Sequence, residues 1–263
     1  MLKRRLTPVL LWRDGSLVQS RGFSCHQKVG SLLETLKRYS HWALDELLII
    51  NISANRYNEP QHFLADVQSV SHLFTMPVTL GGGVTNSESF AKFLKAGADK
   101  VVLGRAALDN LQLIHALSNQ FGSQAVLACL DIIQTSDGYY LRHPFSGDQA
   151  RKLTPHYIQE LETHGIGELV IQSVTRDGSY RGYDTSLLKM VAAISQVPII
   201  ALGGARLPSH VTDALAIEGV EAVALGNAFH HSELSYPLLK RKLVEECALD
   251  TMRPLSDNIL SAR

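Results

Sequence analysis

The strongest constraint on the fold is an internal repeat with a spacing of 122 residues, the distance from Gly81 to Gly203. The pairs of similar stretches that share this spacing are Val78–Gly83 with Ile200–Ala205, Val102–Ala106 with Ala224–Ala228, and Asp45–Ile49 with Gly167–Ile171. Three matches at one spacing are hard to produce by chance. They predict two similar halves, and no linker or change of composition separates the halves into two domains.

Short apolar runs alternate with longer amphipathic stretches along the chain. The runs are Leu6–Leu11, Leu47–Ile52, Val78–Leu80, Lys100–Leu103, Ala125–Leu130, Glu168–Gln172, Pro198–Leu202 and Ala222–Leu225. Continuous apolar runs are typical of parallel strands that are buried on both faces. The stretches between them, such as Gly30–Trp42, Ser87–Ala96 and Leu187–Ser195, are predicted helices, with Asn86 as an N-cap and Gly97 just past a helix end.

Eight such units predict the α/β class and a (β/α)8 TIM barrel built from two half-barrels. The alternative is an open doubly wound sheet, which is disfavoured because no GxGxxG motif follows the first strand. We expect residues 1–249 to form a single barrel and residues 250–263, which lack periodicity, to be a frayed C-terminal tail.

The amino-acid composition of the chain argues against several classes of function. The chain of 263 residues has 25 basic and 25 acidic side chains, and this balance argues against nucleic acid or a membrane surface as partners. Its three cysteines lie far apart, which predicts neither a disulfide framework nor a metal site and fits a cytoplasmic location. No apolar run approaches the length needed to span a bilayer.

Glycine-rich turns follow the predicted strands of each half and are candidates for binding phosphate. Glycine lets backbone N–H groups approach a phosphate closely, and two such pairs would suit one doubly phosphorylated ligand. The alternative is that these glycines only make tight turns. The candidate phosphate- and substrate-binding residues are Gly82, Gly83, Gly104, Arg105, Asp177, Gly178, Gly203, Gly204, Gly226 and Asn227.

Two aspartates are candidates for more specific roles. Asp131 ends the strand Ala125–Leu130, where a carboxylate could act as a general acid or base, or could cap a helix or form a structural salt bridge. Asp177 could line the site, or could simply make the Asp-Gly turn with Gly178.

Four ionisable residues border the starts of the predicted strands: Arg5, Glu46, Lys100 and Glu168. Two cations and two anions could close the bottom of the barrel as a salt-bridge layer, and stability is the usual role of that face. Buried charges persist only when paired, so these four side chains should pair with one another.

The chain up to about Val244 resembles the cyclase-subunit family of imidazole glycerol phosphate synthase (HisF-like). The stretches that carry the resemblance are Asp14-Gly15, Asp45–Leu47, Gly81–Gly83, Gly97–Val101, Phe121–Gln124, Arg176–Gly178, Gly182–Asp184, Gly203–Ala205 and Phe229-His230. The resemblance implies a barrel that takes ammonia from a glutaminase (HisH-like) subunit at its N-terminal face. It also implies a phosphorylated small molecule at the opposite face, and no cofactor or metal.

The same resemblance assigns roles to individual residues. Arg5, Glu46, Lys100 and Glu168 match the gate of the ammonia passage, and Asp99 matches a position in the glutaminase interface. The family pairs two catalytic aspartates. Asp131 matches the second, but Leu11 stands at the first.

Further departures lie at the face where the chemistry would occur. The residues that differ from the family pattern there are Leu11, Gln19, Asn51, Gly104-Arg105, Gln172 and Leu202. The first strand resembles the glycosyl-amidation branch of the family, in which the barrel supplies ammonia to a sugar-amidating synthetase for surface polysaccharide. Three interpretations therefore remain: an ammonia-conducting subunit for sugar amidation, a genuine cyclase of histidine biosynthesis, and a non-catalytic barrel that binds a phosphorylated ligand.

Overall fold

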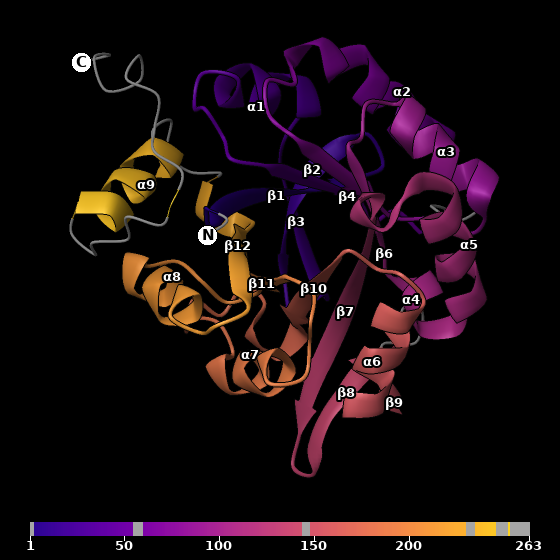
Figure 1. Ribbon diagram of the computed structural model, residues 1–263. Coiled ribbons are helices and arrows are strands. Elements are labelled where there is room, and N and C mark those ends of the chain that lie inside the picture. Colours follow the sequence, from indigo (N-terminus) through magenta and orange to yellow (C-terminus); the bar gives the residue numbers. More distant parts are fainter. Residues whose placement is uncertain (1–2, 55–59, 144–147, 230–234, 246–251, 253–263) are drawn as a thin grey trace.

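Eight parallel strands form a closed barrel in the computed structural model, which describes residues 3–54, 60–143, 148–229, 235–245 and 252 (Figure 1). The strands around the barrel are β1 (Arg5–Arg13), β4 (Leu47–Asn51), β5 (Val78–Gly81), β6 (Lys100–Leu103), β7 (Val126–Thr135), β10 (Glu168–Ser173), β11 (Ile199–Leu202) and β12 (Val220–Leu225). Pairing of β7 with β10 and of β12 with β1 closes the ring. The predicted TIM barrel is confirmed.

Helices pack around the outside of the barrel (Figure 1). They are α1 (Leu32–Tyr39), α2 (Gln61–Val70), α3 (Ser87–Lys95), α4 (Arg105–Asp109), α5 (Leu111–Phe121), α6 (Pro155–Thr163), α7 (Thr185–Ala192), α8 (Pro208–Leu215) and α9 (Ser235–Glu245). Short 3-10 turns lie at η1 (Ser71–Leu73), η2 (Ser123–Ala125), η3 (Val174–Arg176) and η4 (Asn227–Phe229). Among the helices described, no member is both long and apolar enough to cross a bilayer.

The predicted helix signals of α3 are confirmed. The Asn86 side chain accepts a hydrogen bond from the Ser89 backbone N–H, and the Ser89 hydroxyl in turn accepts one from the Asn86 N–H. Gly97 follows the helix with φ +108°, a conformation that favours glycine. The predicted helices are otherwise longer than the observed ones, because their amphipathic pattern continues into the flanking turns.

Each half of the barrel has a β-hairpin extension that was not predicted. After β1, the chain forms β2 (Ser16–Arg21), which pairs antiparallel with β1, and β3 (Cys25–Gly30), which pairs antiparallel with β2. After β7, it forms β8 (Gly138–Arg142) and β9 (Gln149–Lys152) in the same way, and Figure 1 shows β7 and β8 projecting from the barrel. The second extension lies about 122 positions after the first, so the repeat includes these hairpins as well.

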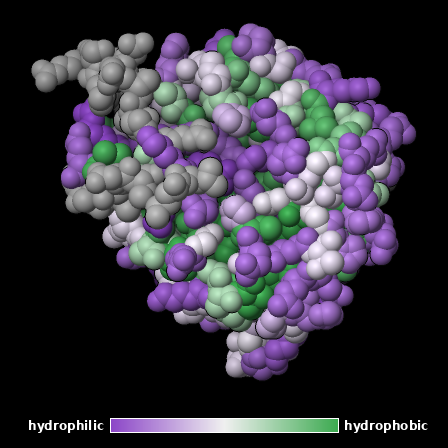
Figure 2. Space-filling model, viewed as in Figure 1, coloured by the Kyte–Doolittle hydropathy of each residue, from purple (hydrophilic) through white to green (hydrophobic). Residues whose placement is uncertain are grey.

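Alternate side chains of the strands face two different apolar layers. The larger layer lies between the strands and the helices, and the smaller one fills the barrel. The inner layer consists of Val9, Leu48, Val102, Leu127, Val170, Ile200, Leu202, Ala222 and Ala224, packed against Leu11, Ile50 and Cys129. On the face shown in Figure 2, hydrophilic residues predominate around the periphery and hydrophobic ones gather toward the centre.

The predicted C-terminal tail, residues 250–263, lies outside the described residues except for Met252. That residue is buried and forms an isolated parallel bridge with Arg4. Cys247 and His230 also lie outside the described part of the chain. The predicted domain boundary therefore stays a prediction.

Candidate functional site

A cavity of about 280 Å³ opens at the carboxyl ends of the barrel strands. This is the face on which barrel enzymes place their active sites. The cavity brings together Leu11, Asp131 and all of the predicted phosphate- and substrate-binding residues: Gly82, Gly83, Gly104, Arg105, Asp177, Gly178, Gly203, Gly204, Gly226 and Asn227. The structure therefore brings these residues together in one cavity, and their roles remain predictions.

The glycines of the site differ in what the fold requires of them. Gly82 has φ +95°, and a Cβ atom there would lie 2.0 Å from the Asn51 carbonyl oxygen. Gly203 has φ +100°, and its Cβ would lie 2.7 Å from the Ser173 carbonyl oxygen. In contrast, a Cβ at Gly104 would meet no atom within 4 Å. The backbone alone explains Gly82 and Gly203, whereas the space beside Gly104 remains available to a ligand.

The sequence predicted that Asp131 ends its strand, but the structure places Asp131 inside β7. The strand continues for four residues to Thr135, where it turns into β8. Asp131 is still level with the ends of the other barrel strands, because it pairs in register with Gln172 of β10. The Cys129 thiol donates to Asp131 Oδ1 over 3.8 Å, and burial raises the pKa of this thiol well above its ordinary value.

Asp177 lines the cavity and also holds the first hairpin in place. Its Oδ2 accepts hydrogen bonds from the Ser20 hydroxyl at 2.8 Å and from the Phe23 N–H at 3.4 Å. Burial raises the pKa of Asp177, although these donors partly oppose the shift. The Asn227 amide donates to the Ser20 carbonyl oxygen at 2.8 Å, so both predicted site residues anchor the end of β2, and Asp177 also holds the turn that follows it.

Arg105 begins α4 beside the cavity. Its Nε donates to Asp109 Oδ2 at 2.9 Å, one helical turn later. This contact orients the side chain along the cavity wall, which Arg105 shares with Arg142 of β8 and Asp131. The guanidinium of Arg142 lies 5.1 Å from the centre of the Phe23 ring, so the two hairpin extensions meet at the mouth.

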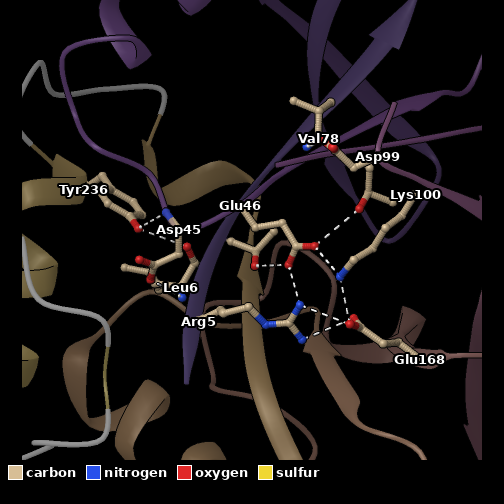
Figure 3. Close-up of polar contacts among 11 residues, drawn as sticks. Arg5, Leu6, Asp45, Glu46, Val78, Asp99, Lys100, Glu168 and Tyr236 are labelled. Carbon is tan, nitrogen blue, oxygen red and sulfur yellow. Dashed lines mark hydrogen bonds and ion pairs between the residues drawn. The ribbon is translucent and has the colours of Figure 1, made fainter. Parts of the chain in front are cut away.

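At the opposite end of the barrel, Arg5, Glu46, Lys100 and Glu168 form a closed ring of ion pairs (Figure 3). Arg5 bonds Glu46 at 3.0 Å and Glu168 at 3.2 Å, and Lys100 bonds the same two carboxylates at 2.9 and 2.8 Å. Burial of the Arg5 guanidinium lowers its pKa, but the attraction of Glu46 and Glu168 is stronger in total, so the pKa of Arg5 is raised. The predicted mutual pairing is confirmed, and these four residues are called the basal ring below.

Two threonines complete the surroundings of Glu46, and sequence reasoning missed them. Thr7 Oγ1 and Thr79 Oγ1 each lie 3.5 Å from one carboxylate oxygen of Glu46. Both threonines are almost completely buried. Their position near the start of a strand, on the side that faces the barrel axis, was the signal that could have found them.

A second buried network lies beside the basal ring. The Lys240 ammonium pairs with Asp45, whose other oxygen accepts from the Leu6 N–H at 3.0 Å. The Tyr236 hydroxyl accepts from the Asp45 N–H and donates to the Leu6 carbonyl oxygen (Figure 3). Lys240 is completely buried, so this network fastens α9 to the base of the barrel.

Asp99, the predicted partner-interface residue, lies at the rim next to the basal ring. Its carboxylate accepts a hydrogen bond from the Val78 N–H at 2.8 Å, and its residue surface is exposed. It thus supports the start of β5 while remaining accessible from outside. Within the described part of the chain, histidine, cysteine and acidic side chains do not gather in groups that could hold a metal ion.

Comparison with known proteins agrees with this geometry. The model of a family described as "Histidine biosynthesis protein" matches residues 5–235. The chain belongs to this family. It is 35% identical over 251 residues to imidazole glycerol phosphate synthase subunit HisF of Stenotrophomonas maltophilia (strain K279a), covering 92% of this chain and 96% of that protein. It is 32% identical over 252 residues to the subunit of the same name from Aeromonas hydrophila, covering 94% and 98%.

The departures from the family pattern can now be placed. Leu11 faces the cavity from β1 and is paired with Ile50 of β4. Gln172 and Leu202 line the same cavity from neighbouring strands. Gln19 lies on β2, where its amide donates to Gln27 Oε1 at 2.9 Å. Aliphatic and amide side chains therefore occupy several positions at which the family pattern described above has ionisable or hydroxyl groups.

Proposed function

We propose that this chain is the ammonia-conducting barrel subunit of a glutamine amidotransferase complex. A HisH-like glutaminase would dock on the face that contains the basal ring and Asp99. Ammonia would pass along the barrel and serve the amidation of a surface-polysaccharide sugar by a synthetase at the opposite face. The observation that supports this proposal is the apolar layer between the basal ring and the cavity.

The apolar layer suits ammonia in its neutral form. Above the basal ring, the inner side chains include Val9, Leu48, Val102, Leu127, Val170 and Ile200. Moving a cation into such surroundings without a partner is strongly unfavourable, whereas a small neutral molecule meets no comparable penalty. Ammonia that enters past the basal ring would therefore remain unprotonated until it approaches Asp131.

The altered cavity supports transfer of ammonia to a different acceptor. Ring closure in the family reaction needs an acid and a base, and each such group typically contributes about 10²–10⁴-fold to the rate. Leu11 cannot exchange a proton, and Asp177 is engaged in holding the first hairpin. Of the two aspartates that line the cavity, Asp131 is therefore the one placed to act as an acid or base from the barrel floor.

The test is cyclase activity with an ammonium salt in place of glutamine. Purified protein receives the formimino ribulosyl aminoimidazole carboxamide ribotide at high pH, and imidazole glycerol phosphate is assayed. Free ammonia bypasses the glutaminase, so a missing partner cannot hide the chemistry. No turnover, from folded protein that still binds and activates a HisH-like glutaminase, is the expected result. Robust turnover that Asp131→Asn abolishes would overturn the conduit proposal.

The second candidate is a genuine cyclase of imidazole glycerol phosphate synthase. The names of the relatives favour it, since the subunits from Stenotrophomonas and Aeromonas are both HisF proteins. The presence of Asp131 in the lining of the cavity also favours it. The ammonium assay separates the two candidates directly.

A further inference from the structure

The floor of the cavity is divided into an apolar and a polar half. Four adjacent strands, β11, β12, β1 and β4, contribute Leu202, Ala224, Leu11 and Ile50 to it. These side chains belong to the inner apolar layer or pack against it. A continuous aliphatic crescent therefore covers one side of the floor, and we call these four residues the apolar crescent.

The opposite side of the floor is polar. Asp131 of β7 and Gln172 of β10 lie side by side, because they are register partners in a parallel pair of strands. Gln172 is only 5% exposed, so its side chain lies well below the mouth of the cavity. A carboxylate and a carboxamide together offer acceptors and donors to the hydroxyl or amide groups of a ligand.

The mouth above this floor contains cations. Arg105, Arg142 and His26 all line it, and the acidic residues that face the same cavity are Asp131 and Asp177. Burial and Arg13 lower the pKa of His26, so the permanent positive charge comes from Arg142 and from Arg105, which also pairs with Asp109. Arginine suits phosphate oxygens because its guanidinium can donate two parallel hydrogen bonds.

We propose that the cavity binds a sugar phosphate whose ring carries an apolar substituent, such as an acylamino or deoxy group. The phosphate would lie at the arginines of the mouth, the polar edge of the ring at Asp131 and Gln172, and the substituent on the apolar crescent. The cavity of about 280 Å³ is near the lower end for small-ligand sites, so it suits one monosaccharide. The identification of this sugar as the ammonia acceptor rests on the proposed function. The proposed mode of binding rests on the cavity alone.

The apolar crescent predicts that the cavity prefers an apolar substituent to a hydroxyl group at this position of the sugar ring. A hydroxyl group held against Leu11 and Leu202 would lose its water without gaining a partner, which is unfavourable. A methyl group in the same place would gain from burial. We therefore expect an N-acetyl substituent to improve binding by about fourfold per methyl-sized group buried.

The test uses N-acetylglucosamine 1-phosphate and glucose 1-phosphate as matched probes. Dissociation constants come from calorimetric titration, and saturation-transfer NMR identifies which probe protons contact the protein. The N-acetyl probe should bind about fourfold to tenfold more tightly, with the strongest saturation at its methyl protons. Equal affinities, or no binding of either probe at millimolar concentration, would overturn the proposal. So would inorganic phosphate that binds as tightly as both probes, since only the anion would then be recognised.

Variants connect the preference to the apolar crescent. Leu11→Asn keeps the branched arrangement of side-chain heavy atoms but places an amide on the apolar side, and it should remove the preference for the N-acetyl probe. Leu238→Ser, on the exposed face of α9, is the matched control and should retain the preference. Circular dichroism verifies that both variants are folded. Activation of a glutaminase by the same preparations is measured separately, so failure of the conduit proposal is distinguishable from failure of this one.

Discussion

Replacing Lys100 with methionine tests the basal ring most directly. Methionine keeps most of the aliphatic length of lysine but removes the ammonium that bonds both Glu46 and Glu168. The ring then holds two carboxylates and one cation, Arg5. Side-chain exposure is 19% for Lys100, 3% for Glu46 and 14% for Glu168, so water can compensate only partly for the missing charge.

The expected loss of stability follows from this burial. Removing one partner of a buried ion pair typically costs about 3–5 kcal/mol, because an uncompensated charge stays behind. Arg5 still bonds both glutamates, and two threonines surround Glu46, so we expect a value near the lower end, about 3 kcal/mol. The free energy of unfolding is obtained from urea denaturation at neutral pH.

The decisive comparison is a double-mutant cycle with Glu168→Gln. The double variant has one cation and one anion in the ring, so charge balance is restored. We expect it to be more stable than the sum of the single changes predicts, by about 1–3 kcal/mol. Lys92→Met is the matched control, because Lys92 forms an exposed pair with Glu88 on α3 and should leave stability almost unchanged. If the loss of unfolding free energy in the double variant equals the sum of the losses in the two single variants, the ring does not act as one network and the reasoning is refuted.

Three other predictions concern single sites. The raised pKa of Asp177 means that the native state binds the proton of this carboxyl group more tightly than the unfolded chain does. The free energy of unfolding should therefore fall as pH rises from the ordinary pKa of 3.8 through the raised native pKa. Asp177→Asn should remove this part of the pH dependence, measured by urea denaturation between pH 3 and 7. Gly82→Ala should lower the yield of folded protein severely because its Cβ would collide with a carbonyl oxygen, whereas Gly104→Ala should fold normally and weaken only phosphate binding, measured by calorimetry. Asn86→Ala should cost about 1 kcal/mol in thermal or urea unfolding through loss of the α3 cap, and a cost near zero would contradict the role of that cap.

The barrel could be predicted because its signals are local and repeated. Apolar runs such as Val78–Leu80 and Ile200–Leu202 are typical of buried strands, and the spacing of 122 residues between these two runs indicated the two halves. The hairpin extensions were missed although the sequence contains a signal for the first. Asp14-Gly15 connects β1 and β2 with φ of +48° and +80°, the conformation of a two-residue hairpin turn. In the sequence analysis this dipeptide served only as one of the stretches that carry the family resemblance.

The same oversight explains why Asp131 was placed at the end of its strand. The residues after it, Ile132–Thr135, continue the extended pattern into β8, which pairs antiparallel with β7. The basal ring was predicted more completely, because buried ionisable groups at strand starts have few alternatives to pairing with one another. The pairing of Asp45 with Lys240 could not be predicted, since the two residues are 195 positions apart and only the docking of α9 brings them together.

The distribution of charge between the two ends of the barrel limits the chemistry at the cavity. At the base, every ionisable residue of the ring contacts two partners of opposite charge, and Asp45 and Lys240 neutralise each other. At the cavity floor, Asp131 is the inward-facing carboxylate, and the apolar crescent faces it. Asp177 and His26 line the same cavity and are further groups that could exchange a proton with a ligand there. The ammonium assay, with Asp131→Asn as the control, therefore separates the proposed transfer of ammonia to an acceptor from ring closure by the barrel.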